Sequence, residues 1–263
     1  MNEVNKTLYI PLYGKSLVSK KGIILRDAKA EEIWSKEGFE LKGKSRSKWL
    51  AYNMAMRARV FDDWTDKMLK ETPDAVVIHI GCGMDSRCLR VTQKYRLWVD
   101  CDFQDVLDIR RQYYEESDSY HMMTLNATDT EQIRELPEAD FAIVVLEGLS
   151  MYLTNDELNR LIASLQDKYQ RISVLMDVYT EFGAKASEKK NPINDVGVTK
   201  TYGVDDIDGL LEGTGVKKIS EHSFTPGELI DELKPSEKCF FKMLFTGKTY
   251  RKIYRLYELK SIV

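Results

Sequence analysis

Apolar residues recur at helical spacing through the first quarter of the chain. In SKWLAYNMAMRARVFDDWTDKMLKE (residues 47–71) they stand three or four positions apart, and EEIWSKEG (residues 31–38) repeats this pattern over a shorter span. Such spacing is typical of helices that bury one face. Pro73 and Asp74 then interrupt it, because proline cannot continue a helix. The pattern predicts a helical segment over residues 1–72.

From residue 75 onward, short apolar runs alternate with amphipathic stretches. The runs predict strands at 75–80, 95–100, 121–125, 141–148 and 172–179. The stretches between them predict helices from Asp85 and at 103–116, 129–136 and 155–169. Continuous apolar strands separated by helices are typical of a parallel sheet that is covered on both faces.

The alternation stops after Tyr179. Residues 181–203 are polar and contain Gly and Pro, so we expect a mobile loop or lid there. The tail then predicts a helix at 205–212, a strand near 216–222, a helix at 226–233 and a final helix–strand or hairpin ending in RLYELK. We therefore expect an α/β fold, built on a seven-stranded, mostly parallel, doubly wound sheet with a C-terminal strand pair.

One large domain is expected, because a chain of 263 residues can bury a single core. We expect it to comprise an N-terminal helical cap (1–72), a core (73–180), a lid or insertion (181–214) and C-terminal strands and helices (215–263).

Composition narrows the class of protein. Apolar residues make up 43% and charged residues 31% of the chain, which favours a folded globular protein over disorder. A net charge of −3 argues against a nucleic-acid groove, which needs clustered Lys and Arg. The chain has neither a signal-peptide pattern nor an apolar stretch of membrane-spanning length. We expect no nucleic-acid or membrane partner.

The cysteines indicate a reducing compartment. Cys82, Cys88, Cys101 and Cys239 show no C-x-x-C spacing, so a zinc site is not expected. Reduced thiols in a cytoplasmic protein are the better interpretation.

A glycine turn follows the first predicted strand, in Gly81-Cys82-Gly83-Met84-Asp85. Glycines there let the backbone approach a ligand closely. The dinucleotide fingerprint G-x-G-x-x-G would need a third glycine where this chain has Ser86, which lowers the case for NAD. The absence of that glycine does not count against S-adenosylmethionine, which has no phosphate to seat.

Two acids close the next predicted strand, about 20 residues after the glycines. Asp100 and Asp102 would lie on one side of an extended segment, so either carboxylate could accept hydrogen bonds from ribose hydroxyls. Together with the glycine turn, they predict a nucleoside-binding half-site and hence an enzyme with an adenosine cofactor.

Further candidate residues occur at the end of the fourth predicted strand and on the long helix. Glu147 and Gly148, with Tyr152 after them, lie where open α/β sheets bind ligands. Arg57 and Arg59 stand on an otherwise apolar helix; either could clamp a carboxylate, or pair with a nearby acid instead.

The three histidines are weaker candidates. His79 lies inside a strand and is better explained as a core histidine with polar partners than as a base. His121 opens a strand. His222 ends one, which makes it the better-placed candidate base.

Taken together, these motifs resemble those of the leucine carboxyl methyltransferase family, which are class I S-adenosylmethionine-dependent enzymes. The similarity is closest to the bacterial branch that includes polyketide O-methyltransferases. It extends from PLYGKSLVSKKGIILRDAKAEEI to RKIYRLYEL. It rests on G-x-G-x-D-x-R, D-x-D-F with a following R-R, and E-G-x-x-M-Y-L, in that order.

The resemblance implies a role for each matching residue. Gly81 and its neighbours Cys82, Gly83 and Asp85 would face the methionine part of the cofactor, with Glu147 and Gly148 beside it. Asp102 would hold the ribose with Asp100 nearby, Asn126 and Ala127 would contact the adenine, and Tyr152 would lie near the reacting end. Arg59 would clamp the cofactor carboxylate with Lys15 as a second cation, although Arg57 also matches an arginine of the bacterial branch.

The expected reaction is methyl transfer to a carboxylate or acidic hydroxyl of a small molecule. A carboxylate, with a pKa near 4, is already ionised at pH 7 and needs no base. The sequence offers no secure base; Tyr152 and His222 are the candidate catalytic residues. Two alternatives stay open: an NAD(P)-dependent oxidoreductase and a non-catalytic S-adenosylmethionine-binding protein. The sequence does not indicate the oligomeric state.

Overall fold

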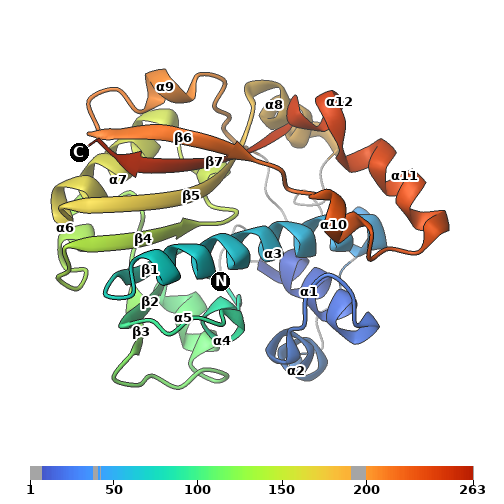
Figure 1. Ribbon diagram of the computed structural model, residues 1–263, viewed down its shortest axis with the longest axis horizontal. Coiled ribbons are helices and arrows are strands. Elements are labelled where there is room, and N and C mark those ends of the chain that lie inside the picture. Colours follow the sequence, from blue (N-terminus) through green and yellow to red (C-terminus); the bar gives the residue numbers. More distant parts are fainter. Residues whose placement is uncertain (1–7, 38–40, 42, 191–199, 263) are drawn as a thin grey trace.

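The fold is built on a single mixed sheet. The computed structural model describes residues 8–37, 41, 43–190 and 200–262. Its strands are β1 (Val76–Ile80), β2 (Leu97–Asp102), β3 (Tyr120–Thr124), β4 (Phe141–Leu146), β5 (Arg171–Tyr179), β6 (Val216–His222) and β7 (Tyr254–Ser261). They lie in the order β3-β2-β1-β4-β5-β7-β6 (Figure 1). The first five are parallel, and β7 is antiparallel to β5 and β6. The predicted α/β sheet, with its C-terminal strand pair, is confirmed.

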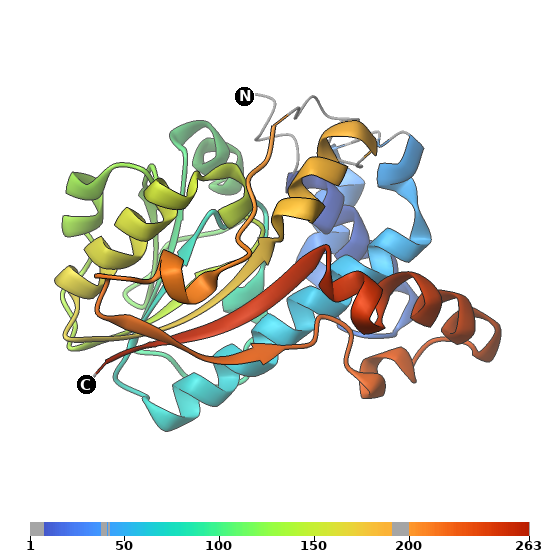
Figure 2. The same cartoon turned by 90° about the horizontal axis from the view of Figure 1, so that it is seen from above.

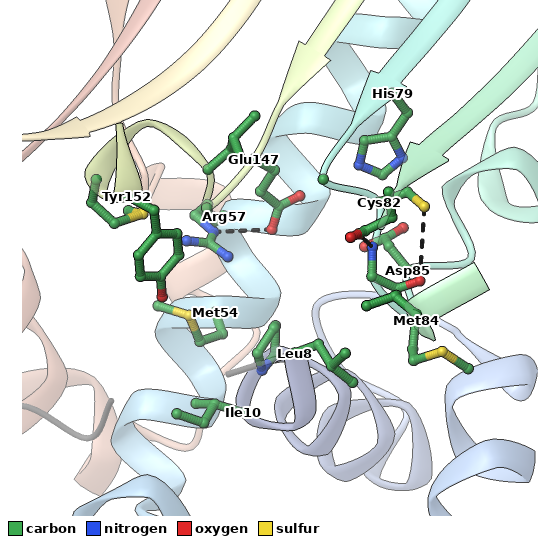
Figure 3. A pocket seen from close by; sticks show the side chains of 18 of the residues that line it. Leu8, Ile10, Met54, Arg57, His79, Cys82, Met84, Asp85, Glu147 and Tyr152 are labelled. Atoms are coloured by element: carbon green, nitrogen blue, oxygen red, sulfur yellow. Dashed lines mark hydrogen bonds and ion pairs between the residues drawn. The ribbon is translucent and has the colours of Figure 1, made fainter. Parts of the chain in front are cut away.

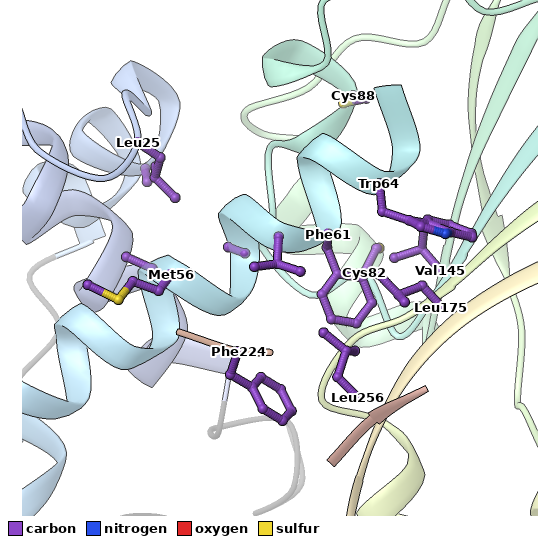
Figure 4. Close-up of a cluster of buried hydrophobic side chains, with 14 of the residues drawn as sticks. Leu25, Met56, Phe61, Trp64, Cys82, Cys88, Val145, Leu175, Phe224 and Leu256 are labelled. Carbon is purple, nitrogen blue, oxygen red and sulfur yellow. The ribbon is translucent and has the colours of Figure 1, made fainter. Parts of the chain in front are cut away.

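The N-terminal segment forms helices, the longest of which lies across one face of the sheet. They are α1 (Tyr9–Lys21), α2 (Ala28–Glu37), the 3-10 turn η2 (Gly43–Arg46) and α3 (Lys48–Glu71). On α3, Phe61 and Trp64 are buried against side chains of β4, β5 and β7 (Figure 4). The helical prediction for this segment is confirmed over its described residues, and α3 ends two residues before Pro73, as predicted.

The opposite face is covered by α6 (Thr130–Arg134), α7 (Asn155–Lys168) and α9 (Ile207–Leu210) (Figure 2). Successive strand residues point to opposite faces. Val77 therefore belongs to the core under α3, whereas its neighbours Val76 and Ile78 belong to the core under α7. This burial on both faces explains why the strand sequences are continuously apolar.

The remaining helices differ in part from the prediction. They are α4 (Arg87–Arg90), α5 (Gln104–Arg110), the 3-10 turn η3 (Ser150–Tyr152), α8 (Glu181–Lys190), α10 (Gly227–Ile230), α11 (Pro235–Phe245) and α12 (Gly247–Arg251). The loop predicted over 181–203 is wrong for residues 181–190, which form α8; their Ala, Glu and Lys residues favour a helix. Residues 191–199 of that prediction lie outside the described residues.

The longest described helix is not a membrane span. Although α3 has 24 residues, Lys, Arg and Asp recur along it, and no other helix in the described ranges combines the required length and apolarity.

The strand order creates one position at which connections leave the sheet in opposite directions. From β1 the chain continues to β2 and β3 on one side of the sheet. It then returns to β4, which lies on the other side of β1. In open α/β sheets, ligands bind at the carboxyl ends of the strands that flank such a point.

Candidate functional site

A cleft opens at this position, between the carboxyl ends of β1, β2 and β4 and the helices α1 and α3 (Figure 3). It holds about 1140 Å³ free of protein atoms, counting the part open to solvent. Clefts of this kind, at the carboxyl ends of the strands, are where open α/β sheets bind ligands.

The glycine turn after β1 forms one wall of the cleft. Gly81 and Gly83 have φ angles of 72° and 51°, in the left-handed region that glycine tolerates best. The amides of Gly81 and Cys82 donate to the carbonyl of Cys101, at 2.8 and 3.1 Å. A Cβ atom on Gly83 would lie 3.3 Å from the Cβ of Leu8, so glycine also lets α1 approach closely.

Asp102 presents a carboxylate to the cleft beside this turn. Its Oδ2 accepts from the Gly83 amide at 2.7 Å, and its Oδ1 accepts from the Phe103 amide at 2.8 Å. Burial raises the pKa of this carboxyl, although the two amide hydrogen bonds act in the opposite direction. The turn and the acid are thus joined directly.

Asp100 does not line the cleft, contrary to the expectation that both acids could serve a ligand. Its carboxylate binds Arg110 and accepts hydrogen bonds from Trp98 Nε1 (2.8 Å) and the Tyr120 hydroxyl (2.7 Å). Burial alone would raise its pKa, but the Arg110 guanidinium lowers it to about 2. Arg110 also donates to the Gly83 carbonyl at 3.0 Å, so Asp100 supports the turn from behind.

Arg57 occupies the opposite side of the cleft, at the end of β4. Its Nε donates to Glu147 Oε1 at 2.9 Å, and its Nη1 donates to Asp177 Oδ2 at 2.9 Å and to the Tyr254 hydroxyl at 2.8 Å. Gly148 has a φ of 72°, and a Cβ there would lie 3.4 Å from Arg57 Nη2. Glycine therefore leaves space for the guanidinium.

A second cation, Lys15 of α1, also lines the cleft and forms an ion pair with Asp85 of the glycine turn. Arg87, fully buried, binds Glu147 and donates to Asp62 of α3 at 2.7 Å. Burial alone would raise the pKa of Glu147, but Arg57 and Arg87 lower it to about 2. These pairs hold α1, α3 and the sheet around one cavity.

The rest of the wall is apolar and aromatic. It consists of Leu8, Ile10, Pro11, Leu50, Met54, Met84, Val106, Leu149 and Met151, with the rings of Phe103, Tyr152 and Tyr179. Tyr152 of η3 and Met54 of α3 both point into the cavity (Figure 3). One part of the cleft is therefore charged and another part is suited to an apolar molecule.

Arg59 lies outside this cleft, which corrects its placement as the clamping arginine. Its Nε donates to Asp63 at 2.8 Å, and its side chain is 42% exposed. Two residues along an α-helix correspond to a rotation of roughly 200°. Since Arg57 faces the cavity, Arg59 must face away from it.

His222 is also absent from the cleft wall, contrary to its selection as a candidate base. Its Nε2 lies 2.7 Å from Glu258 Oε2 and 3.1 Å from the Ser220 hydroxyl. It ends β6, the outer strand of the sheet, and its partner comes from the adjacent β7.

Asn126 and Ala127 follow β3 and do not line the cleft either. The Asn126 amide oxygen, expected to face a ligand, accepts from the amide and hydroxyl of Thr128, at 3.1 and 2.9 Å. Ala127 is buried in the core under α7. An Asn at this position bonds readily to its own turn, and this competes with a contact to a ligand.

His79 is buried, with its Nδ1 3.2 Å from Asp100 and its Nε2 3.4 Å from Arg87. This agrees with the prediction of a core histidine that has polar partners, although its ring also borders the cleft. His121 is exposed on β3.

Three residues that shape the cleft were missed from the sequence as site residues: Arg87, Asp177 and Tyr254. A signal existed for two of them. Arg87 closes the G-x-G-x-D-x-R motif, and Asp177 is a charge within the apolar run ISVLMDVY. A buried carboxylate requires a partner, so Asp177 pointed to an internal cation.

Comparison with known proteins gives concordant results. A family model described as leucine carboxyl methyltransferase matches residues 3–166. The tetracenomycin polyketide synthesis O-methyltransferase TcmP of Streptomyces glaucescens is 27% identical over 241 residues, covering 89% of this chain and 88% of that protein. The S-adenosyl-L-methionine-dependent methyltransferase dpfgK of Gibberella zeae is 28% identical over 226 residues, covering 76% and 75%.

Solved structures share the fold at low sequence identity. Magnesium protoporphyrin IX methyltransferase of Synechocystis, with bound S-adenosylhomocysteine, has a TM-score of 0.51 and 13% identity, covering 88% of this chain and 97% of that one. A methyltransferase of Anabaena variabilis has a TM-score of 0.54 and 12% identity, covering 79% and 84%.

Proposed function

Because this chain belongs to the leucine carboxyl methyltransferase family, with S-adenosylmethionine as its methyl donor, we propose that it methylates an oxygen atom of a small molecule. The acceptor oxygen belongs to a carboxylate or an acidic hydroxyl. The relative TcmP, aligned over 89% of this chain, is a polyketide O-methyltransferase, and this alignment is the observation that carries the proposal.

The residues of the cleft fit this cofactor. Asp102, beside the glycine turn, is the acid that would hold the ribose hydroxyls. Lys15 and Arg57 would hold the carboxylate of the methionine part, with Asp85 and Glu147 close to its amino group. Arg57 Nη2 supports this assignment, because it forms no hydrogen bond to the residues that the structure describes.

When bound, the cofactor supplies a methyl group on a positively charged sulfur, which is open to in-line attack. The chain's contribution is position and the exclusion of water. Well-oriented intramolecular reactions lower a barrier by ~7–11 kcal/mol. Met54, Met151 and Tyr152 form the apolar wall against which an acceptor would be held.

The charges in the cleft favour an acceptor that is already ionised. Glu147, with a pKa of about 2, is too weak a base to remove a proton from a neutral alcohol at pH 7. Burial, together with Asp177, raises the pKa of Tyr254 well above its usual value, so this hydroxyl stays protonated. A carboxylate acceptor needs no base, which is why it is preferred here.

The proposal also covers partners and location. A net charge of −3 favours a small-molecule acceptor over a nucleic acid. The four cysteines are free thiols, three of them buried, which supports a reducing, cytoplasmic location.

The decisive experiment incubates the protein with small-molecule extract and methyl-labelled S-adenosylmethionine, and identifies the labelled product by mass spectrometry. We expect one principal acceptor, whose label is lost in mild base as an ester or, for an acidic hydroxyl, retained as an ether. Label on nitrogen, carbon or sulfur would contradict O-methylation.

Measurements of ligand binding, turnover and thermal stability separate the alternatives. S-adenosylhomocysteine binding without turnover on any acceptor would favour a non-catalytic binding protein. Thermal stabilisation by NAD instead of S-adenosylhomocysteine would revive the oxidoreductase; a ligand at 100 times its Kd stabilises by ~2.7 kcal/mol.

A further inference from the structure

Among the described residues, hydrogen bonds hold two of the three guanidinium nitrogens of Arg57. Nε and Nη1 make three hydrogen bonds, to Glu147, Asp177 and Tyr254. Nη2 makes none to the described residues, and it lies against Gly148 at the cleft. An arginine held in this way presents a preset donor pair to an anion.

Two of the three anchors come from the last part of the fold. Asp177 belongs to β5 and Tyr254 begins β7, and both lie beyond residue 166, where the family match ends. Asp177 is fully buried; its Oδ2 accepts from Arg57 and from the Tyr254 hydroxyl, while its Oδ1 accepts from the Gly148 amide at 2.7 Å.

The ring of Tyr254 is itself fixed. It stacks on Phe224 with centroids 4.5 Å apart and packs against Tyr179 at 4.8 Å. Because the ring is packed against two others, its hydroxyl has a fixed position. Arg57 Nη1 is held where it can donate to that hydroxyl.

We propose that Asp177 and Tyr254 are positioning residues that act through Arg57, by holding its free nitrogen where the cofactor carboxylate binds. This inference rests on the proposed function. An arginine side chain has several rotatable bonds, and ordering it on binding would otherwise reduce affinity. The buried acid and the tyrosine hydroxyl order it before the ligand arrives.

The test compares S-adenosylhomocysteine with adenosine, which lacks the carboxylate, by isothermal titration calorimetry. In Tyr254→Phe, we expect the Kd for S-adenosylhomocysteine to rise about tenfold, the size of a hydrogen bond to a charged group, and that for adenosine to stay unchanged. Tyr250→Phe is the matched control. It removes another buried tyrosine hydroxyl, which donates to Asn53 at 3.0 Å and, unlike that of Tyr254, accepts no hydrogen bond from Arg57, so both Kd values should stay near the wild-type level.

A double-mutant cycle tests whether Tyr254 acts through the arginine. In an Arg57→Ala background, Tyr254→Phe should cause no further loss of S-adenosylhomocysteine affinity. Asp177→Asn, which keeps the shape but loses the charge, should resemble Tyr254→Phe.

Several results would overturn the proposal. These are unchanged Kd values in Tyr254→Phe, equal losses for both ligands, and a full additional loss in the Arg57→Ala background. Failure of the wild-type protein to bind S-adenosylhomocysteine would instead overturn the cofactor site itself, so the two failures are distinguishable.

Discussion

Asp100 and Asp102 lie on the same face of β2, yet only Asp102 reaches the cleft, while Asp100 binds Arg110 beneath the glycine turn. The two carboxylates therefore have different roles, one in ligand binding and one in supporting the glycine turn. The outer acid is available to a ligand, and the inner acid supports the backbone to which the outer one is bonded.

For the outer acid, we expect Asp102→Ala to weaken S-adenosylhomocysteine binding more than tenfold, because ribose hydroxyls would lose a charged acceptor. Calorimetry measures this. Asp108→Ala, which removes an exposed acid of α5, is the control and should leave the Kd unchanged. An unaltered Kd in Asp102→Ala would remove the ribose assignment.

For the inner acid, Asp100→Asn should destabilise the protein by about 3–5 kcal/mol at pH 7, because Arg110 is left buried without its charge partner. The folded-state pKa of about 2 lies below the ordinary value of 3.8, so the ionised acid stabilises the fold above that value. This part of the stability is lost as pH falls through about 2, so the difference between the wild type and the variant should narrow there. Urea unfolding at a series of pH values checks this; a constant difference would refute it.

Arg57 and Arg59 form a matched pair two residues apart on α3. Arg57→Ala should raise the Kd for S-adenosylhomocysteine more than that for adenosine, by tenfold or more, since a charge-assisted hydrogen bond to the carboxylate is lost. Arg59→Ala should leave both Kd values unchanged, because its side chain pairs with Asp63 away from the cleft. The opposite ranking would restore the assignment first expected from the sequence.

Substitutions at Tyr152 and His222 show which of these two candidate catalytic residues takes part in methyl transfer. Tyr152→Phe should lower the rate of methyl transfer to the acceptor found in extract, with little change in S-adenosylhomocysteine affinity, because its hydroxyl borders the apolar part of the cleft. His222→Gln should keep the wild-type rate, since His222 pairs with Glu258 at the outer strand. A large rate loss in His222→Gln would contradict its exclusion from the site.

The sheet could be predicted from the sequence because its strands are buried on both faces. Short, continuously apolar runs such as AVVIHI and FAIVVLEG, which alternate with amphipathic stretches, are typical of such strands. The boundaries were less accurate: β2 extends to Asp102 although the predicted strand ended at Asp100. Ladder hydrogen bonds to β1 and β3 set that boundary, and they are not visible in a one-dimensional pattern.

The candidate site was predicted only in part, for a related reason. Gly81, Gly83, Asp102 and Glu147 stand at or just after strand ends, so topology alone brings them together. The choice between Arg57 and Arg59 depends on how α3 is rotated against the sheet. Tyr254 depends on β7 inserting antiparallel between β5 and β6, and no local signal near residue 254 encodes that.

The cleft takes Lys15 from near the start of the chain and Tyr254 from near its end. During synthesis, the ribosome must therefore release the whole segment from Lys15 to Tyr254 before the pocket wall is complete. A nascent chain that has the glycine turn and both acids, but not yet β7, already has half of a nucleoside site while its arginine lacks the tyrosine anchor.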